Sequence, residues 1–101
     1  MFFAQGDIIK ISGFKTDFLV ISKNSFINAV RMFHVCPLLT DVEAGPLHIP
    51  VTGNNGSSGT AICEQIKLID PAIRNCRKTD WLPYGQIMEI SDAIQGMFEY
   101  D

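Results

Sequence analysis

The segment Gly59-Thr-Ala-Ile-Cys-Glu-Gln-Ile-Lys-Leu-Ile-Asp70 is the most informative part of this 101-residue chain. Its side chains alternate as in a β-strand, and the face that is otherwise apolar carries Glu64 in its middle, while the opposite face carries Gln65 and Lys67. Acidic, amide and cationic side chains rarely occupy positions in a protein interior. Two interpretations follow: the strand is the edge of a small barrel with solvated polar groups, or it presents a functional site.

Further strand patterns surround this segment. They cover residues 6–12, 17–22, 33–39, 46–51 and 77–81, and residues 59–69 are expected to form one continuous strand. Residues 52–58 form a loop by composition, and 24–30 are expected to form one or two helical turns with Asn24 or Ser25 as the cap.

The C-terminal region has a helical period instead. An apolar stripe, which we expect to pack on the sheet rather than bind a partner, consists of Ile87, Ile90, Ile94, Met97 and Phe98. Short antiparallel strands followed by one helix predict a mainly β fold with a C-terminal α-helix. The expected architecture is a small SH3-like barrel in a single domain, residues 1–101.

Composition narrows the class of protein. With 47% hydrophobic and 19% charged residues, the chain is expected to fold, and it has no apolar run that could span a membrane and no secretion signal, which predicts a cytoplasmic protein. Its three cysteines are odd in number and lack C-x-x-C spacing, which favours reduced thiols over a zinc site or a disulfide frame. A net charge of −3 without a basic stripe argues against duplex-DNA binding, but a local groove for single-stranded RNA stays compatible with it.

Five segments in order resemble the MazF/PemK toxins, the endoribonucleases of bacterial toxin–antitoxin pairs. They are Gly6-Asp-Ile-Ile9, Phe18 to Asn28, Val35-Cys-Pro-Leu38, Leu47-His-Ile-Pro-Val51 and Glu64-Gln-Ile-Lys-Leu-Ile-Asp70. The resemblance implies a MazF/PemK-like barrel in a homodimer that cuts single-stranded RNA without a metal or cofactor. It also implies a cognate antitoxin that covers the RNA groove, and no membrane partner.

The chain departs from this family at its catalytic positions. The arginine expected before Leu19 is missing, because the chain reads Thr16-Asp17-Phe18 there. The family's Pro-Leu-Thr is Pro37-Leu38-Leu39, so Thr40 comes one residue late and would face the other way unless a bulge intervenes. The connection between the first two strands, usually long, has only about four residues.

The remaining polar residues are candidates for the missing roles. We expect Glu64 to act as acid/base or orienting group and Lys67, with Lys15 or Arg31, to stabilise the phosphate. Thr40 is the candidate for the displaced threonine. The residues expected to contact RNA are Gln65, Arg31, His34 and Asp41.

The two histidines have structural explanations as well. His34 is either a general base or a hydrogen-bonded surface residue, and the second interpretation is favoured for a histidine beside Phe33 and Val35. His48 is interpreted as the outward residue of an alternating strand. Cys63 is expected to be a packing residue whose pKa the neighbouring carboxylate of Glu64 raises.

Two other functions stay open. The same barrel could have kept its fold and dimer while losing nuclease chemistry, leaving a binding or regulatory module, since fold and site are separable. A toxin aimed at a protein such as gyrase would instead use the C-terminal helix and Trp81.

Overall fold

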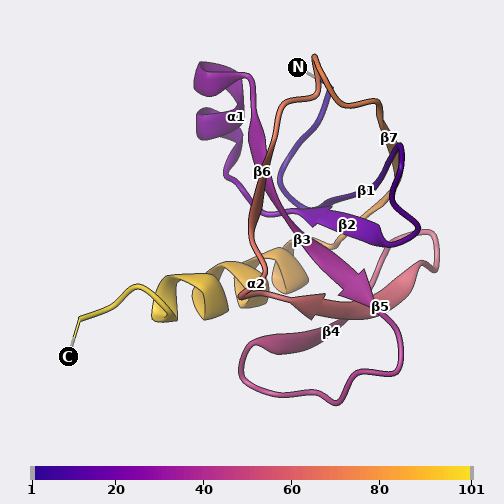
Figure 1. Ribbon diagram of the computed structural model, residues 1–101. Helices are drawn as coiled ribbons and strands as arrows, with labels where there is room; N and C mark the ends of the chain where they lie inside the picture. Colours follow the sequence, from indigo (N-terminus) through magenta and orange to yellow (C-terminus); the bar gives the residue numbers. More distant parts are fainter. Residues whose placement is uncertain (1, 101) are drawn as a thin grey trace.

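The computed structural model describes residues 2–100 and confirms a mainly β fold with a C-terminal helix (Figure 1). The elements in chain order are β1 (Asp7–Ile11), β2 (Asp17–Val20), α1 (Asn24–Val30), β3 (Phe33–Leu39), β4 (His48–Thr52), β5 (Ser58–Ile62), β6 (Lys67–Ile69), β7 (Cys76–Trp81) and α2 (Tyr84–Gly96).

All strand pairs are antiparallel, and the strands follow the order β4-β5-β3-β2-β1-β7, with β6 added to β3. The central strands are apolar on both faces, because the sheet separates two cores. Successive residues therefore enter different cores: Ile8 and Leu19 lie on one side, Ile9 and Phe18 on the other. The first core includes Cys36, Leu38, Ile49, Val51, Ala61, Cys63, Leu82 and Ile90; the second includes Ile11, Val20, Ile27, Phe33, Val35 and Ile69.

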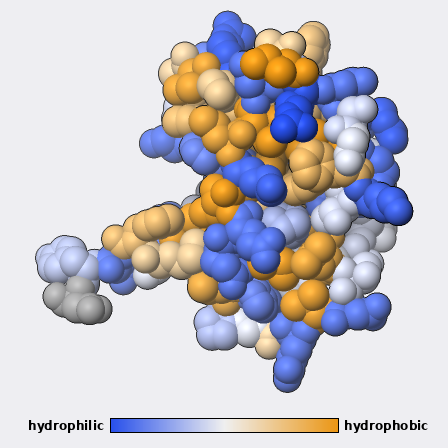
Figure 2. All heavy atoms as spheres, in the orientation of Figure 1, coloured by the Kyte–Doolittle hydropathy of each residue, from blue (hydrophilic) through white to orange (hydrophobic). Residues whose placement is uncertain are grey.

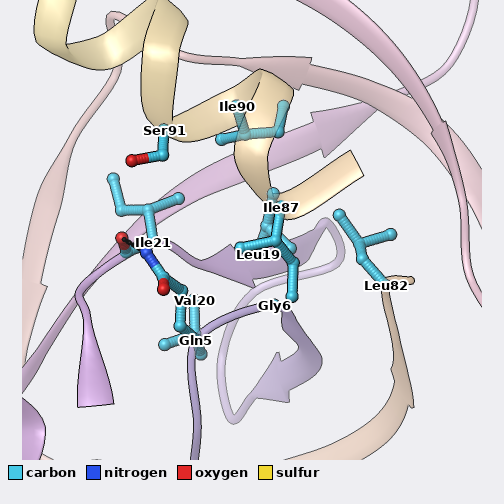
Figure 3. A pocket seen from close by; sticks show the side chains of 9 residues that line it. All are labelled: Gln5, Gly6, Leu19, Val20, Ile21, Leu82, Ile87, Ile90 and Ser91. Atoms are coloured by element: carbon cyan, nitrogen blue, oxygen red, sulfur yellow. Dashed lines mark hydrogen bonds between the residues drawn. The ribbon is translucent and has the colours of Figure 1, made fainter. Parts of the chain in front are cut away.

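Helix α2 closes the first core, as the apolar stripe predicts. Ile90 is buried against it, and Ile87 and Ile94 pack beside it. Figure 3 shows Ile87 lying over Gly6, where a Cβ would stand 2.7 Å from Ile87 Cγ1. The crevice beneath the helix measures about 10 Å³, which is room for one water and excludes it as a ligand site. Within residues 2–100, no helix is both long and apolar enough to cross a membrane.

The prediction of one strand over residues 59–69 is wrong. β5 ends at Ile62, a turn closed by the Gln65 N–H donating to the Ile62 carbonyl follows, and β6 begins at Lys67. The reason is register: β5 faces β3 with Leu38 opposite Ala61, whereas β6 faces it with Val35 opposite Lys67. From Ala61 to Lys67 the chain advances six residues, whereas the facing segment of β3, from Leu38 to Val35, advances only three. Three residues therefore lie outside the ladder of backbone hydrogen bonds, and the alternation of side chains is lost in this turn.

Two local predictions at helix ends are also wrong. Lys23 is the N-terminal cap of α1 and makes no side-chain cap bond, because the Asn24 carboxamide instead accepts the Gln5 N–H at 2.8 Å. Phe98 lies beyond α2 and is 76% exposed, so the apolar stripe leaves the core before its end.

The loop between β4 and β5 is held by a buried carboxylate. Asp80 on β7 accepts the backbone N–H groups of Asn55 at 2.9 Å, Ser57 at 3.0 Å and Trp81 at 2.7 Å. Gly53 lies directly against this carboxylate, and a Cβ there would come within 2.5 Å of Asp80 Cγ. The glycine-rich loop is therefore a fixed part of the fold.

Candidate functional site

A hollow of about 290 Å³ opens where the β1–β2 turn meets the end of β3. It brings together Lys15 and Thr40, two of the residues singled out from the sequence. The other residues that line it are Lys10, Thr16, Asp17, Leu38, Leu39 and Ser58. Hydroxyl, ammonium and carboxylate groups thus share one solvent-open site.

The main charged pair of this hollow was not anticipated from the sequence. Lys10 Nζ lies 2.6 Å from Asp17 Oδ1, with the two side chains 49% and 34% exposed. The hairpin register explains the pair, since Ile9 faces Phe18 and the next residues out are Lys10 and Asp17. Opposite charges flanking a short hairpin turn were the available signal. Pairs this exposed contribute little to stability, so both groups stay available for chemistry.

Thr40 reaches the hollow without a bulge. β3 ends at Leu39, and Thr40 lies in the turn that follows, where the backbone of Asp41 has a φ of 58°. Outside the strand, the alternation rule no longer decides which way the side chain faces. The one-residue displacement of Thr40 therefore does not remove it from the site.

An aromatic and basic surface adjoins the hollow. Lys67 Nζ and Arg74 Cζ lie 5.8 Å and 5.6 Å from the centroid of the Phe14 ring. A second hollow of about 300 Å³ shares Lys10 with the first and is lined by Phe14 and Arg77 as well. We call the residues of both hollows, together with Lys67 and Arg74, the Phe14 surface.

The Phe14 surface reverses the charge of the chain as a whole. It carries five cations and one carboxylate, Asp17, and so has a net charge of +4, whereas the complete sequence has −3. The sequence shows no basic stripe because these cations come from four separate segments, which only the fold brings together. A phosphodiester strand would find both positive charge and an exposed aromatic ring here.

Glu64 lies elsewhere, at the opposite end of β5. Its carboxylate oxygens lie 2.9 and 3.0 Å from His48 Nε2, on the first residue of β4. The backbone N–H of Glu64 and the hydrogen bond with His48 lower the pKa of the carboxyl group, so Glu64 is held as a carboxylate. The carboxylate is suited to accepting hydrogen bonds and orienting a ligand rather than to donating a proton. Reading His48 as an outward strand residue missed this partner.

The other RNA-binding candidates are distributed over both ends of the sheet. Thr40 is next to Leu39, which faces Thr60 near the start of β5, whereas Glu64 and Gln65 lie in the turn beyond its end at Ile62. Arg31 ends α1 in a left-handed conformation, at the far end of β3 from Thr40. Asp41 lies on the same side as Thr40. Within one chain, the predicted residues therefore form two groups rather than one constellation.

The hydrogen-bonded interpretation of His34 agrees with the structure. Ser22 Oγ accepts the backbone N–H of His34 at 2.6 Å and lies 2.9 Å from its Nδ1. Since this oxygen already accepts one hydrogen, its own O–H is free to donate to Nδ1. The ring also lies 5.1 Å from that of Phe26. His34 thus has a structural role at the β2–β3 junction.

No group of three or more His, Cys, Asp or Glu side chains in the described part of the chain is arranged to hold a metal ion. The hollow has one carboxylate and two ammonium groups.

Comparison with solved structures decides the fold. No protein-family model matches the chain, and no curated protein matches it in sequence. A MazE–MazF complex from Deinococcus radiodurans superposes with a TM-score of 0.80 at 15% identity, covering 97% of this chain and 96% of that one. The chain has the MazF fold. MazF from the same organism gives a TM-score of 0.76 at 14% identity, covering 93% of this chain and 94% of that one.

The MazF fold extends over nearly the entire chain. The Mycobacterium tuberculosis toxin MazF-mt6 aligns over 93% of this chain and 98% of its own, with a TM-score of 0.68 and 20% identity. The fold prediction made from the sequence resemblance is confirmed. At these identities the likeness is one of fold, so the site must be argued from the residues of this chain.

Proposed function

We propose that this protein is the toxin of a toxin–antitoxin pair and that it cleaves single-stranded RNA in the hollow beside Thr40. The observation that carries the proposal is the meeting of Lys15 and Thr40 with the Lys10–Asp17 pair on a MazF fold. Two of these residues, Lys15 and Thr40, also stand at positions that the sequence resemblance singles out. The adjoining Phe14 surface supports a polyanionic substrate.

The groups in the hollow fit a metal-independent transfer of the phosphodiester. The 2′-hydroxyl attacks phosphorus, the carboxylate of Asp17 takes its proton, and the bond to the 5′-oxygen breaks to leave a 2′,3′-cyclic phosphate. Lys10 and the Thr40 hydroxyl stabilise the charge on the phosphorane oxygens. The ammonium of Lys15 supplies the proton for the leaving 5′-oxygen. Two lysines thus replace the arginine that the family pattern contains.

We assign RNA binding, rather than bond cleavage, to the second group of residues. Glu64 lies in the turn beyond the end of β5, whereas the hollow lies at the other end of this strand, beside Ser58. The fixed carboxylate of Glu64 and the amide of Gln65 can accept and donate hydrogen bonds to base edges. Lys67, on the Phe14 surface, holds the backbone between the two groups.

The proposed partners follow from charge and exposed apolar surface. An acidic antitoxin would compete with RNA for the Phe14 surface, and the MazE–MazF complexes of the same fold support a protein partner of this kind. Figure 2 shows apolar side chains along α2 where the helix projects from the body. Met88 and Phe98 are 48% and 76% exposed, which supports a homodimer that covers this helix.

A non-catalytic binding module is the second candidate. It is favoured by the Lys10–Asp17 contact, because the Asp17 carboxylate has to leave its ammonium partner before it can contact a substrate hydroxyl. A protein of this kind would bind single-stranded RNA on the Phe14 surface without cutting it.

The test is cleavage of a mixed-sequence single-stranded RNA by purified protein in EDTA. We expect wild type to cut, Asp17→Asn and Thr40→Val to lose at least about 100-fold in rate, and Lys23→Ala, an exposed cation outside both hollows, to match wild type. RNA binding without cutting by folded protein would favour the binding module. Loss of cutting in Glu64→Gln but not in Thr40→Val would place the reaction at the other end of β5.

A further inference from the structure

Two of the three cysteines face each other across neighbouring strands. β3 and β5 are paired with Leu38 opposite Ala61 and Leu39 opposite Thr60, so two residues further along the same register Cys36 comes opposite Cys63. Cys63 is the first residue after β5, and its N–H still donates to the Leu47 carbonyl at 2.9 Å, so the pairing with the β4 side extends to this residue before the chain turns. Both cysteines are completely buried in the first core.

The Cys63 thiol also acts electrostatically on Cys36. Burial raises the pKa of Cys36, and the charge of Cys63 raises it further. Burial, followed by the charge of Glu64, raises the pKa of Cys63 to about 11. The effect of Cys63 on Cys36 agrees with the proximity that the strand register requires.

We propose that Cys36 and Cys63 form a reversibly oxidisable dithiol, which glutathione disulfide converts into a cross-strand disulfide between β3 and β5. Directly opposed residues of an antiparallel pair have Cβ atoms about 4.5–5.5 Å apart, slightly more than the roughly 3.5–4.5 Å of a relaxed disulfide. A small movement of the strands closes the gap, and the strain that remains makes the bond easy to reduce.

The reaction proceeds by two exchanges. The turn after Cys63, which carries the exposed Glu64 and Gln65, opens first, and the Cys63 thiolate attacks glutathione disulfide and releases one glutathione. When the turn closes, the Cys36 thiolate attacks the Cys63 sulfur and releases the second glutathione. The protein loses two protons and two electrons, and one glutathione disulfide becomes two glutathione thiols.

This inference does not depend on the proposed function. It places a crosslink one residue before Glu64, so oxidation fixes the start of the turn that carries the Glu64–His48 pair. Cys76 is not part of the pair: it begins β7, faces Ile11 on β1, and packs on the second core. Cys76→Ser is therefore a suitable background for the experiment.

The experiment incubates folded Cys76→Ser protein in glutathione redox buffers, blocks free thiols with N-ethylmaleimide in denaturant, and measures intact mass. We expect both thiols to be lost with the mass of two hydrogens and to return with dithiothreitol. With Cys63→Ser added, the single Cys36 thiol should stay free, and with Cys36→Ser added, oxidation should stop at one glutathione bound to Cys63. Peptide mapping of the oxidised protein should give one linked pair that contains Cys36 and Cys63, whatever the folding of those variants.

Two outcomes would overturn the proposal. One is that both thiols of the folded protein stay free in buffers that oxidise the urea-unfolded chain completely. The other is that glutathione accumulates on the cysteines separately and no linked peptide forms.

Discussion

Two aspartates of this fold are used in opposite ways. Asp80 is 1% exposed and accepts three backbone N–H groups, whereas Asp17 has a side chain 34% exposed with a single lysine partner. Burial raises the pKa of Asp80, but the hydrogen bonds from Asn55, Trp81 and Ser57 outweigh it and bring the pKa to about 2. All the hydrogen bonds of the Asp80 carboxylate serve the fold, whereas the Asp17 carboxylate can still exchange its lysine partner for a ligand.

The difference separates stability from function. Around Asp80 the contacts are backbone bonds inside the protein, which the fold cannot lose without leaving a buried charge unpaired. Around Asp17 the contacts are exposed ion pairs and cation–aromatic contacts, which cost little to break. Mutations at the two regions should therefore change different measurements.

The largest expected effect is a loss of stability from Gly53→Ala. The added methyl group would overlap the Asp80 carboxylate and force it off its three N–H donors. We expect the free energy of unfolding to fall by about 3 kcal/mol, measured by urea denaturation. Gly85→Ala is the control, because no atom lies within 4 Å of its added Cβ and alanine favours the helix by about 0.5–1 kcal/mol. Equal stability of the two variants would show that the loop does not depend on the hydrogen bonds to the Asp80 carboxylate.

Asp80 should next give the fold a specific acid sensitivity. Its folded pKa of about 2 lies below the ordinary value of 3.8, so the unfolded chain takes up a proton first as the pH falls. The stabilisation is complete above about pH 5 and is lost progressively toward pH 2. Asp80→Asn should lower the Tm at pH 7 by several degrees and flatten this part of the pH profile. An unchanged profile would mean that other carboxylates cause the acid unfolding.

At the Phe14 surface we expect the reverse: weaker RNA binding at constant stability. Lys10→Ala and Arg77→Ala should each lower the slope of log affinity against log salt by about 0.7, the value for one phosphate contact on a single strand. Thermal unfolding of both variants should match wild type. Binding titrations at several salt concentrations test this, with Lys23→Ala as the matched control. If the slope stays the same in both variants, RNA phosphates do not contact Lys10 or Arg77, and the Phe14 surface is not the RNA-binding surface.

A small effect on stability is also expected for Glu64→Gln. The carboxylate and His48 are 41% and 36% exposed, so their contact is screened by solvent. The Tm should move by no more than about 1 °C, while RNA binding weakens through the lost acceptor. A larger drop in Tm would mean that the Glu64–His48 pair stabilises the fold by joining β4 to the turn after β5. Glu64 would then have a structural role like that of Asp80 and not a ligand-binding role like that proposed for Asp17.

Sequence reasoning was most successful where local pattern decides structure. The ranges 24–30 and 33–39 match α1 and β3 exactly, because each is bounded by a change of period within the segment itself. It failed at residues 63–66, where the alternation continues in the sequence although the backbone turns. That turn exists because β5 and β6 meet β3 in different registers, and register is a property of two strands rather than one.

The candidate site shows the same division. Lys15 and Thr40 were found from their places beside recognisable segments, and the hollow unites them. Lys10, Asp17 and His48 were missed, since each acquires its role from a partner on a neighbouring strand.

The fold class, the C-terminal helix and the resemblance to the MazF/PemK toxins follow from the amino-acid sequence alone, because they depend on the spacing of apolar residues and on short motifs; the division of residues 59–69 into β5 and β6 does not. Only the tertiary structure decided which charges meet. Folding gathers five of the eight lysines and arginines of an acidic chain around Phe14 and places Glu64 at the other end of β5. Electrostatic interactions depend on distance in space, and the distance between residues of different strands is set by their pairing in the sheet.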